Sequence, residues 1–129
     1  MKSKFSILFT VVAVFVSASV FAHHGAAVVY HLDQSVTKTG VVVDFQFINP
    51  HVLVFFEVDE DNGETVVWSG GLTSPNRLAR SDGWSVNTLE TGDEVIVTGA
   101  PARGGAPSIW VEQVMHDGRA LLGGPQPTR

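Results

Sequence analysis

The chain has 129 residues, with 8 Lys and Arg against 13 Asp and Glu, and its formal charge at pH 7 is −5. It contains no cysteine, which excludes disulfides, thiolate metal sites, iron–sulfur clusters and thiol nucleophiles. We expect no nucleic-acid partner, because generic nucleic-acid binding needs an excess of Lys and Arg to neutralise phosphates.

The first 22 residues have the order of a secretory signal peptide: a basic start, an apolar run and small residues that end at Ala22. We therefore expect cleavage after Ala22 and a periplasmic or secreted protein. Two alternatives stay open, a cut after Ala18 and an uncleaved anchor, since the apolar run approaches the roughly 18 residues that can span a bilayer. Cleavage after Ala22 would leave one domain of 107 residues with a formal charge of −7 and no membrane span.

The mature chain begins with a short segment, residues 23–35, that we interpret as an arm or an edge strand leading into a domain over residues 36–122. Apolar residues recur at every second position from Val41 to Phe47, which is the period of a half-buried strand. A second strand is expected after the Asn49–Pro50 break. Asn62–Gly63 predicts a hairpin to the third strand.

One short helix separates these three strands from two more. Ser74 is a good helix cap, Pro75 suits the first turn and Gly83 ends the pattern. A fourth strand is expected over residues 94–99 and a fifth within residues 106–118. The segment Arg-Ala-Leu-Leu then forms a short final strand or extension, and residues 123–129 are expected to be disordered because they have no apolar anchor.

This order of elements matches an all-β fold, the small five-stranded oligonucleotide/oligosaccharide-binding (OB) barrel with one short helix between strands three and four. A small open sandwich would give the same one-dimensional pattern. We favour the barrel because closure removes the sheet edges and buries the many apolar positions of a short sheet.

Histidines suggest a metal site. Cleavage after Ala22 would make His23 the first residue, so its free amine and its imidazole could chelate one ion, and His51 at the rim of the sheet could add a third nitrogen. Such ligands favour Cu(II) over other divalent ions. His24 would assist, and Asp44 or Asn49 could orient an imidazole by hydrogen bonding.

Simpler interpretations of the same residues stay open. The His pair can be polar residues of a mobile arm, and a cut after Ala18 would remove the terminal chelate. His51 can instead support the turn that follows Pro50. His31 and His116 are expected to be solvated or structural.

Two other classes of function compete with metal binding. A metal-free module could bind an anionic or saccharide ligand, or an envelope protein, through Arg77, Arg80 and Arg103 and an aromatic face. Most of the aromatic residues are expected in the core; they are Phe45, Phe47, Phe55, Phe56, Trp68 and Trp110. An enzyme using His51 as a general base would need a carboxylate within hydrogen-bond reach. We expect a binding protein rather than an enzyme.

Several motifs resemble those of a family of small exported bacterial proteins of unknown function: His-His-Gly, Asn-Pro-His, Gly-Asp-x-Val, Pro-Ala-Arg and Asp-Gly-Arg. The likeness covers nearly the whole mature chain but supplies no activity. The polar residues that it marks are His23, His24, Asn49, His51, Arg80, Trp84, Asp93 and Arg103. The chain departs from this family at Ala26 and Phe47, where Trp is common.

Overall fold

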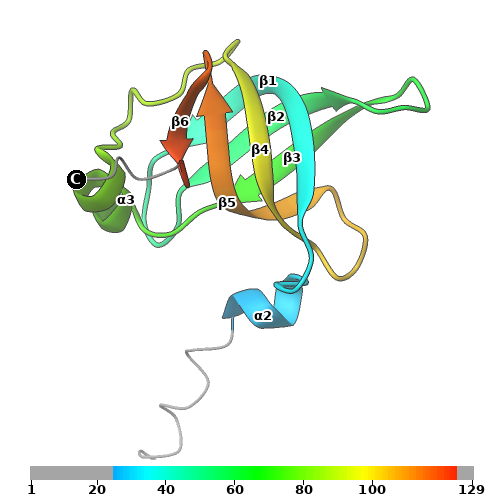
Figure 1. The fold of residues 1–129 in the computed structure, drawn as a ribbon, viewed down its shortest axis with the longest axis horizontal. Coiled ribbons are helices and arrows are strands. Elements are labelled where there is room, and N and C mark those ends of the chain that lie inside the picture. The colour runs from blue at the N-terminus through cyan, green and yellow to red at the C-terminus, as the bar shows by residue number, and fades with distance from the viewer. Residues whose placement is uncertain (1–24, 125–129) are drawn as a thin grey trace, which may run out of the picture.

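The computed structural model describes residues 25–124, which form one β-rich domain (Figure 1). The predicted cleavage site, His23 and His24 lie outside the described residues, as do residues 125–129 of the predicted tail. The elements in chain order are α2 (Gly25–Val29), β1 (Val36–Gln46), β2 (Leu53–Asp59), β3 (Thr65–Gly71), α3 (Pro75–Asp82), β4 (Glu94–Pro101), β5 (Ser108–His116) and β6 (Arg119–Leu122).

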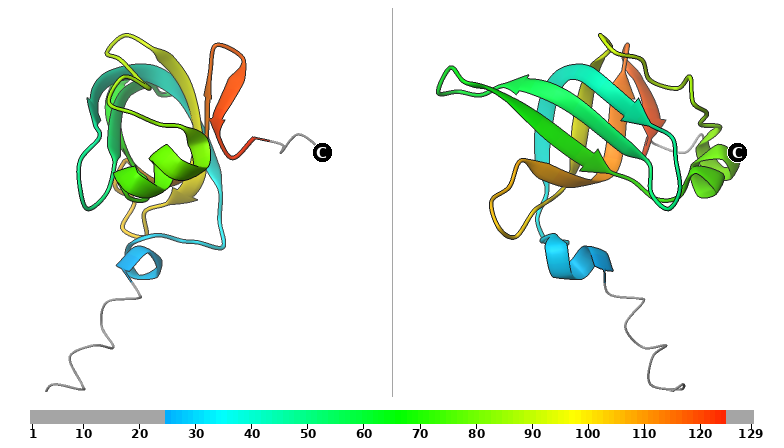
Figure 2. Two further views of the ribbon diagram at one scale, coloured as in Figure 1. Left: turned by 90° about the vertical axis from the view of Figure 1, so that its left-hand side faces the viewer. Right: turned by 180° about the vertical axis from the view of Figure 1, so that it is seen from behind.

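Five strands close into a barrel. Antiparallel pairing runs in the order β3-β2-β1-β4-β5, and a parallel pairing of β3 with β5 closes the ring, with residues 69–71 opposite residues 108–110. The helix α3 stands between β3 and β4 in the chain, so the predicted OB-like fold is confirmed. The sixth strand, β6, adds a hairpin to β5 outside the ring (Figure 2).

The core fills the barrel and continues under α3. Its most deeply buried large side chains come from β1, β2, β4 and β5, the loops and α3: Phe56, Leu72, Leu78, Ile109, Val42, Val52, Val54, Val95, Val97 and Val114. The helix begins as predicted, since the side chain of Ser74 accepts a hydrogen bond from the amide of Arg77, and it ends at Gly83 in the left-handed conformation. Trp84 then packs into the core and donates its indole N–H to the carbonyl of Leu121.

The alternation of buried and exposed residues predicted from Val41 to Phe47 is wrong at the start of that run. Val42 is fully buried, whereas Val41 is 39% exposed. A bulge between Val42 and Asp44 inserts one residue relative to β2, and this reverses which positions face inward. Phe45 and Phe47 therefore pack against the core although they are out of phase with Val42.

The described part of the amino-terminal arm, residues 25–35, begins with a helix rather than a strand. The helix α2 has five residues. After it, the arm pairs with the barrel through an isolated β-bridge between Tyr30 and Ala102. No helix within residues 25–124 has both the length and the apolar character needed to cross a membrane.

Candidate functional site

The arm and the barrel enclose a cavity of about 450 Å³, here called the arm cavity. One side belongs to the arm and the other to the outer surface of the barrel, at the β1–β2 connection, β2, β3 and β5. The lining residues are Gly25, Ala26, Val29 and Tyr30 from the arm and His51, Leu53, Gly71 and Trp110 from the barrel. A cavity of this size is in the range that small-molecule sites occupy.

The floor of the arm cavity is the indole ring of Trp110. Along β5 the neighbours Ile109 and Val111 are buried, so the alternation of a strand turns Trp110 outward. The parallel register places Gly71 beside it, and a side chain there would start 3.3 Å from the indole ring. Glycine at this position therefore lets the indole approach β3 closely.

Two aromatic side chains flank Trp110. The ring centroid of Tyr30 lies 6.0 Å away at a tilt of 43°, and that of His51 lies 5.6 Å away, edge-on at 84°. Both arrangements belong to the favourable classes of aromatic pairs. Trp110 thus contacts both the arm, through Tyr30, and His51, the metal ligand predicted at the rim of the sheet.

Hydroxyl groups fasten Tyr30 to the barrel seam. Its phenol oxygen is 3.0 Å from the hydroxyl of Ser108, and that hydroxyl accepts a hydrogen bond of 3.0 Å from Ser69. Ser69 and Ser108 are paired across the parallel β3–β5 junction that closes the barrel. The residue that follows α2 is therefore fixed to the strand pairing that closes the barrel.

Arg103, in the loop between β4 and β5, fastens the arm a second time. Its backbone amide donates to the carbonyl of Val29 at 2.8 Å, and its Nε donates to the carbonyl of Ala27 at 3.0 Å. Its Nη1 is 3.3 Å from Nδ1 of His31, whose amide donates to the carbonyl of Pro101 at 2.9 Å. Because a guanidinium can only donate, this His31 nitrogen is the acceptor in the contact.

His51 is exposed, just before β2, with its ring against Trp110. Asp44 and Asn49, which were predicted to orient a ligand, are also exposed, and neither makes a hydrogen bond to His51. The carboxylate of Asp44 accepts instead from Gln46 at 2.8 Å. Within residues 25–124 no carboxylate is hydrogen-bonded to His51, and no three His, Cys, Asp or Glu side chains form a group that could hold a metal ion.

The three arginines of the predicted anion site are not together. Arg77 and Arg80 are on α3, whereas Arg103 is in the β4–β5 loop on the opposite side of the barrel (Figure 2). Arg77 lines another cavity, between α3 and β5, and Glu112 lines that cavity too. The side chain of Arg103 is hydrogen-bonded to the arm.

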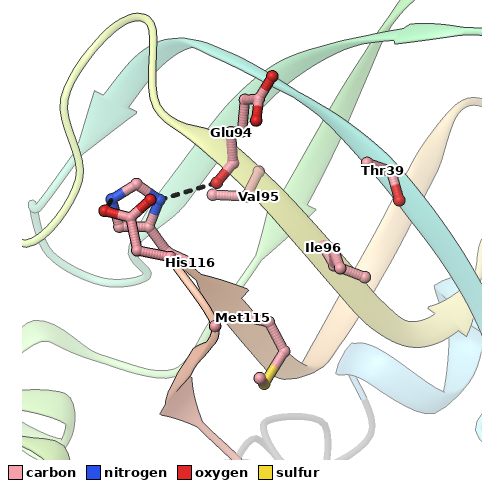
Figure 3. A pocket seen from close by; sticks show the side chains of 8 residues that line it. Thr39, Glu94, Val95, Ile96, Met115 and His116 are labelled. Atoms are coloured by element: carbon pink, nitrogen blue, oxygen red, sulfur yellow. Dashed lines mark hydrogen bonds and ion pairs between the residues drawn. The ribbon is translucent and has the colours of Figure 1, made fainter.

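His116 is the last residue of β5, at the opposite end of the strand from Ser108. Figure 3 shows its ring beside the backbone of Glu94. Its Nδ1 donates to the carbonyl of Glu94 at 2.8 Å, and its Nε2 is 3.3 Å from a carboxylate oxygen of Asp117 and 3.8 Å from one of Asp93. The hydrogen bond to the carbonyl raises the pKa of His116, and the two carboxylates add to the increase. The residue lines a cavity of about 280 Å³.

Most of the aromatic side chains serve the core, as expected. Phe56 is fully buried, and Phe45, Phe47 and Trp68 pack against the core. At the far end of the barrel, Trp68 donates its indole N–H to Glu60 and lies under the ammonium group of Lys38. Trp110 is thus the tryptophan that faces the arm cavity.

Sequence reasoning missed the combination of Tyr30, Trp110 and Arg103. The apolar residues on either side of Trp110 indicate that its own side chain points outward, so this feature could have been predicted from the sequence. The contacts of Tyr30 and Arg103 join positions more than 70 residues apart in the chain, so no local pattern reports them.

The search of curated proteins found no match to this chain. Among solved structures it is similar to one from the crystal structure of yeast Stn1 and Ten1, with 17% sequence identity and a TM-score of 0.41. That match covers 64% of this chain and 42% of the other, so the chain spans less than half the length of that structure. The model of the Family of unknown function (DUF6152) matches residues 11–109, which include the predicted arm and His51. The chain therefore belongs to the DUF6152 family of unknown function.

Proposed function

We propose that this protein binds a divalent metal ion, with copper favoured, between the amino terminus created by removal of the leader and His51. His23 would supply its amine and imidazole, His51 a third nitrogen, and His24 an additional or alternative ligand. The site would hold or deliver the ion in the periplasm or outside the cell. Residues 1–22, which have the pattern of a signal peptide, support that location.

One observation carries the proposal: Gly25 and His51 line the same cavity. Gly25 directly follows His24 in the chain, and two residues of extended chain reach about 7 Å. His23 and His24 therefore come directly before a residue that lines the same cavity as His51, which is close enough in sequence for their nitrogens and that of His51 to share one ion. The fastening of the arm by Tyr30 and Arg103 supports this, because a held arm loses less freedom when the ion binds.

The chemistry of the ligands favours copper. The chain has no cysteine, so a thiolate site is excluded, and imidazole and amine nitrogens bind Cu(II) more strongly than Zn(II) or Ni(II). The terminal amine and the imidazoles must lose their protons to coordinate, so binding should weaken as the pH falls, beginning below about 8, where a terminal amine becomes protonated.

The test is a calorimetric titration with Cu(II) of the protein secreted by its own export machinery, after its first residue has been identified by mass spectrometry. We expect one ion per chain and a start at His23. His51→Ala should weaken binding at least about 100-fold, because loss of an outer partner alone typically costs 10–100-fold. His116→Ala is the matched control, since His116 is at the other end of β5.

A second variant isolates the amine. A chain that retains Ala22 before His23 keeps every imidazole but moves the amine one residue away, so it should lose the tight site. Equal affinity of wild type, the extended chain and His51→Ala would refute the proposal.

The apolar arm cavity also favours a second candidate, a metal-free module that holds a small ligand against Trp110. Binding of an anionic ligand has less support, because Arg103 is hydrogen-bonded to the arm and lies apart from Arg77 and Arg80. A saccharide stacked on the indole, or an envelope protein bound at the same surface, remains compatible with the lining. Quenching of tryptophan fluorescence by a saccharide, lost in Trp110→Phe and independent of copper, would favour this candidate.

A further inference from the structure

The arm cavity is lined mainly by apolar side chains. Leu53 of β2 and Trp110 of β5 face outward into it, because the residues on either side of each are buried in the core. Ala26 and Val29 close the cavity from the arm, and none of its described lining residues is Asp, Glu, Lys or Arg. A charged ligand would lose its hydration here without gaining an ionic partner, so the lining favours an uncharged ligand.

The lining residues offer few hydrogen-bonding groups to a ligand. The hydroxyl of Tyr30 is already held by Ser108 at 3.0 Å. Within residues 25–124 the ring nitrogens of His51 have no hydrogen-bonded partner, and its ring packs edge-on against Trp110. The other two tryptophans donate their indole N–H inside the protein, whereas that of Trp110 has no acceptor in the described part of the chain and is open to solvent. A saccharide, with a hydroxyl on most of its carbons, would need more partners than these.

We propose that the arm cavity binds an uncharged, planar aromatic molecule that packs against the indole ring of Trp110 and forms a hydrogen bond with the imidazole of His51. Aromatic rings attract one another at centroid distances of about 4.5–7 Å, and Tyr30 and His51 flank Trp110 within that range. A volume of about 450 Å³ admits a molecule of one or two rings. The inference rests on the cavity of the second candidate function and not on the metal ion, because it uses residues 25–124 alone.

The wall that the arm contributes is held in place by the protein itself. Tyr30 is hydrogen-bonded to Ser108, and Arg103 donates to the carbonyls of Ala27 and Val29. A ligand that enters a preformed site does not have to order the chain around it, so more of its contact energy appears as affinity. The cavity therefore suits a small ligand that makes few contacts.

The test is a titration followed by NMR, with a metal chelator present so that no copper takes part. The probes are indole, its charged analogue indoleacetate, and methyl glucoside. We expect indole to shift the indole N–H resonance of Trp110, which is assigned by its loss in Trp110→Phe. Indole should bind at least about tenfold more tightly than indoleacetate or methyl glucoside, because the lining has no ionic partner and few polar groups.

Four variants locate the bound probe. Ala26→Phe should exclude indole by filling the cavity, and Ala27→Phe is the matched control, since Ala27 is exposed and does not line the cavity. Trp110→Ala should weaken binding about 5–150-fold, the range for removing an aromatic ring on which a planar ligand stacks. His51→Ala should weaken it about 2–12-fold by loss of one hydrogen bond. The spectrum of each variant without probe shows that it is folded, and Ala26→Phe leaves Trp110 in place.

Binding of indole that is lost in Ala26→Phe and kept in Ala27→Phe would establish the inference. Equal affinity of wild type and Ala26→Phe would overturn it, and so would the absence of any shift at the solubility limit of indole. Tighter binding of indoleacetate would refute the uncharged class of ligand. Binding of methyl glucoside alone at Trp110 would also overturn the inference but would leave the second candidate function standing. None of these outcomes bears on copper binding, which the chelator removes from the experiment.

Discussion

Replacing Trp110 by alanine tests the contact between arm and barrel without any metal. The indole is in contact with Tyr30 on one side and His51 on the other. Each aromatic pair contributes about 0.5–1.5 kcal/mol beyond its buried area, and a fully buried Trp→Ala change costs about 3–5 kcal/mol. Because Trp110 is only partly buried, we expect the free energy of unfolding to fall by about 2–3 kcal/mol.

Urea denaturation measures this loss. With a slope near 1 kcal/mol per M, at the low end for small proteins, the midpoint should move down by about 2–3 M. Trp110→Phe keeps a ring and should lose about half as much. Val86→Ala, at a side chain that is 65% exposed, is the control and should stay within about 0.5 kcal/mol of wild type. A loss under about 0.5 kcal/mol in Trp110→Ala would show that the arm does not depend on this ring.

Three further outcomes follow from the barrel itself. Gly70→Ala should destabilise the protein by about 1–3 kcal/mol in urea unfolding, because the added carbon would lie 2.8 Å from side chains of β2 and β5. Gly104→Ala, with open space around the added carbon, should be near neutral. A larger loss in Gly104→Ala than in Gly70→Ala would refute the close packing around Gly70. Ser74→Ala should cost about 1 kcal/mol by loss of the α3 cap, and no change in the urea midpoint would contradict it. The raised pKa of His116 means that its stabilisation is complete below the unfolded pKa and disappears as the pH rises through the folded value. His116→Gln should therefore cost more stability at pH 5.5 than at pH 8, and an equal loss at both would contradict this.

The order of elements was predictable because its signals are local. Asn62–Gly63 forms the β2–β3 hairpin, with Gly63 in a left-handed conformation, and Ser74 and Gly83 bound α3 as their residue types indicate. Alternating burial along β2 and β4 matches their apolar patterns. The closed barrel followed from the count and order of these elements.

The bulge in β1 was not predictable from a strict period of two. Four consecutive positions from Val41 to Asp44 include three valines, so the pattern does not say which valine faces inward. The structure assigns that place to Val42, since the pairing with β4 on one side and β2 on the other fixes the register. Tertiary pairing therefore decided what local alternation could not.

The position of His51 was predictable from the sequence, but the arrangement of the arm around it was not. His51 lies at the rim where the Pro-His step suggested, and the arm returns to that rim. Two hydrogen bonds from Arg103 hold the arm there, whereas the sequence had suggested this residue for an anion site. Its partners are backbone carbonyls of α2, and the sequence gives no sign of them.

The most direct test of the metal site is pulsed electron paramagnetic resonance of the secreted protein loaded with one equivalent of Cu(II). The modulation from remote imidazole nitrogens counts the histidines on the ion. The proposal predicts at least two imidazoles with a terminal amine in wild type, and one fewer imidazole in His51→Ala. A wild-type spectrum that His51→Ala leaves unchanged would contradict the proposal, because the ion would then be bound by the arm alone.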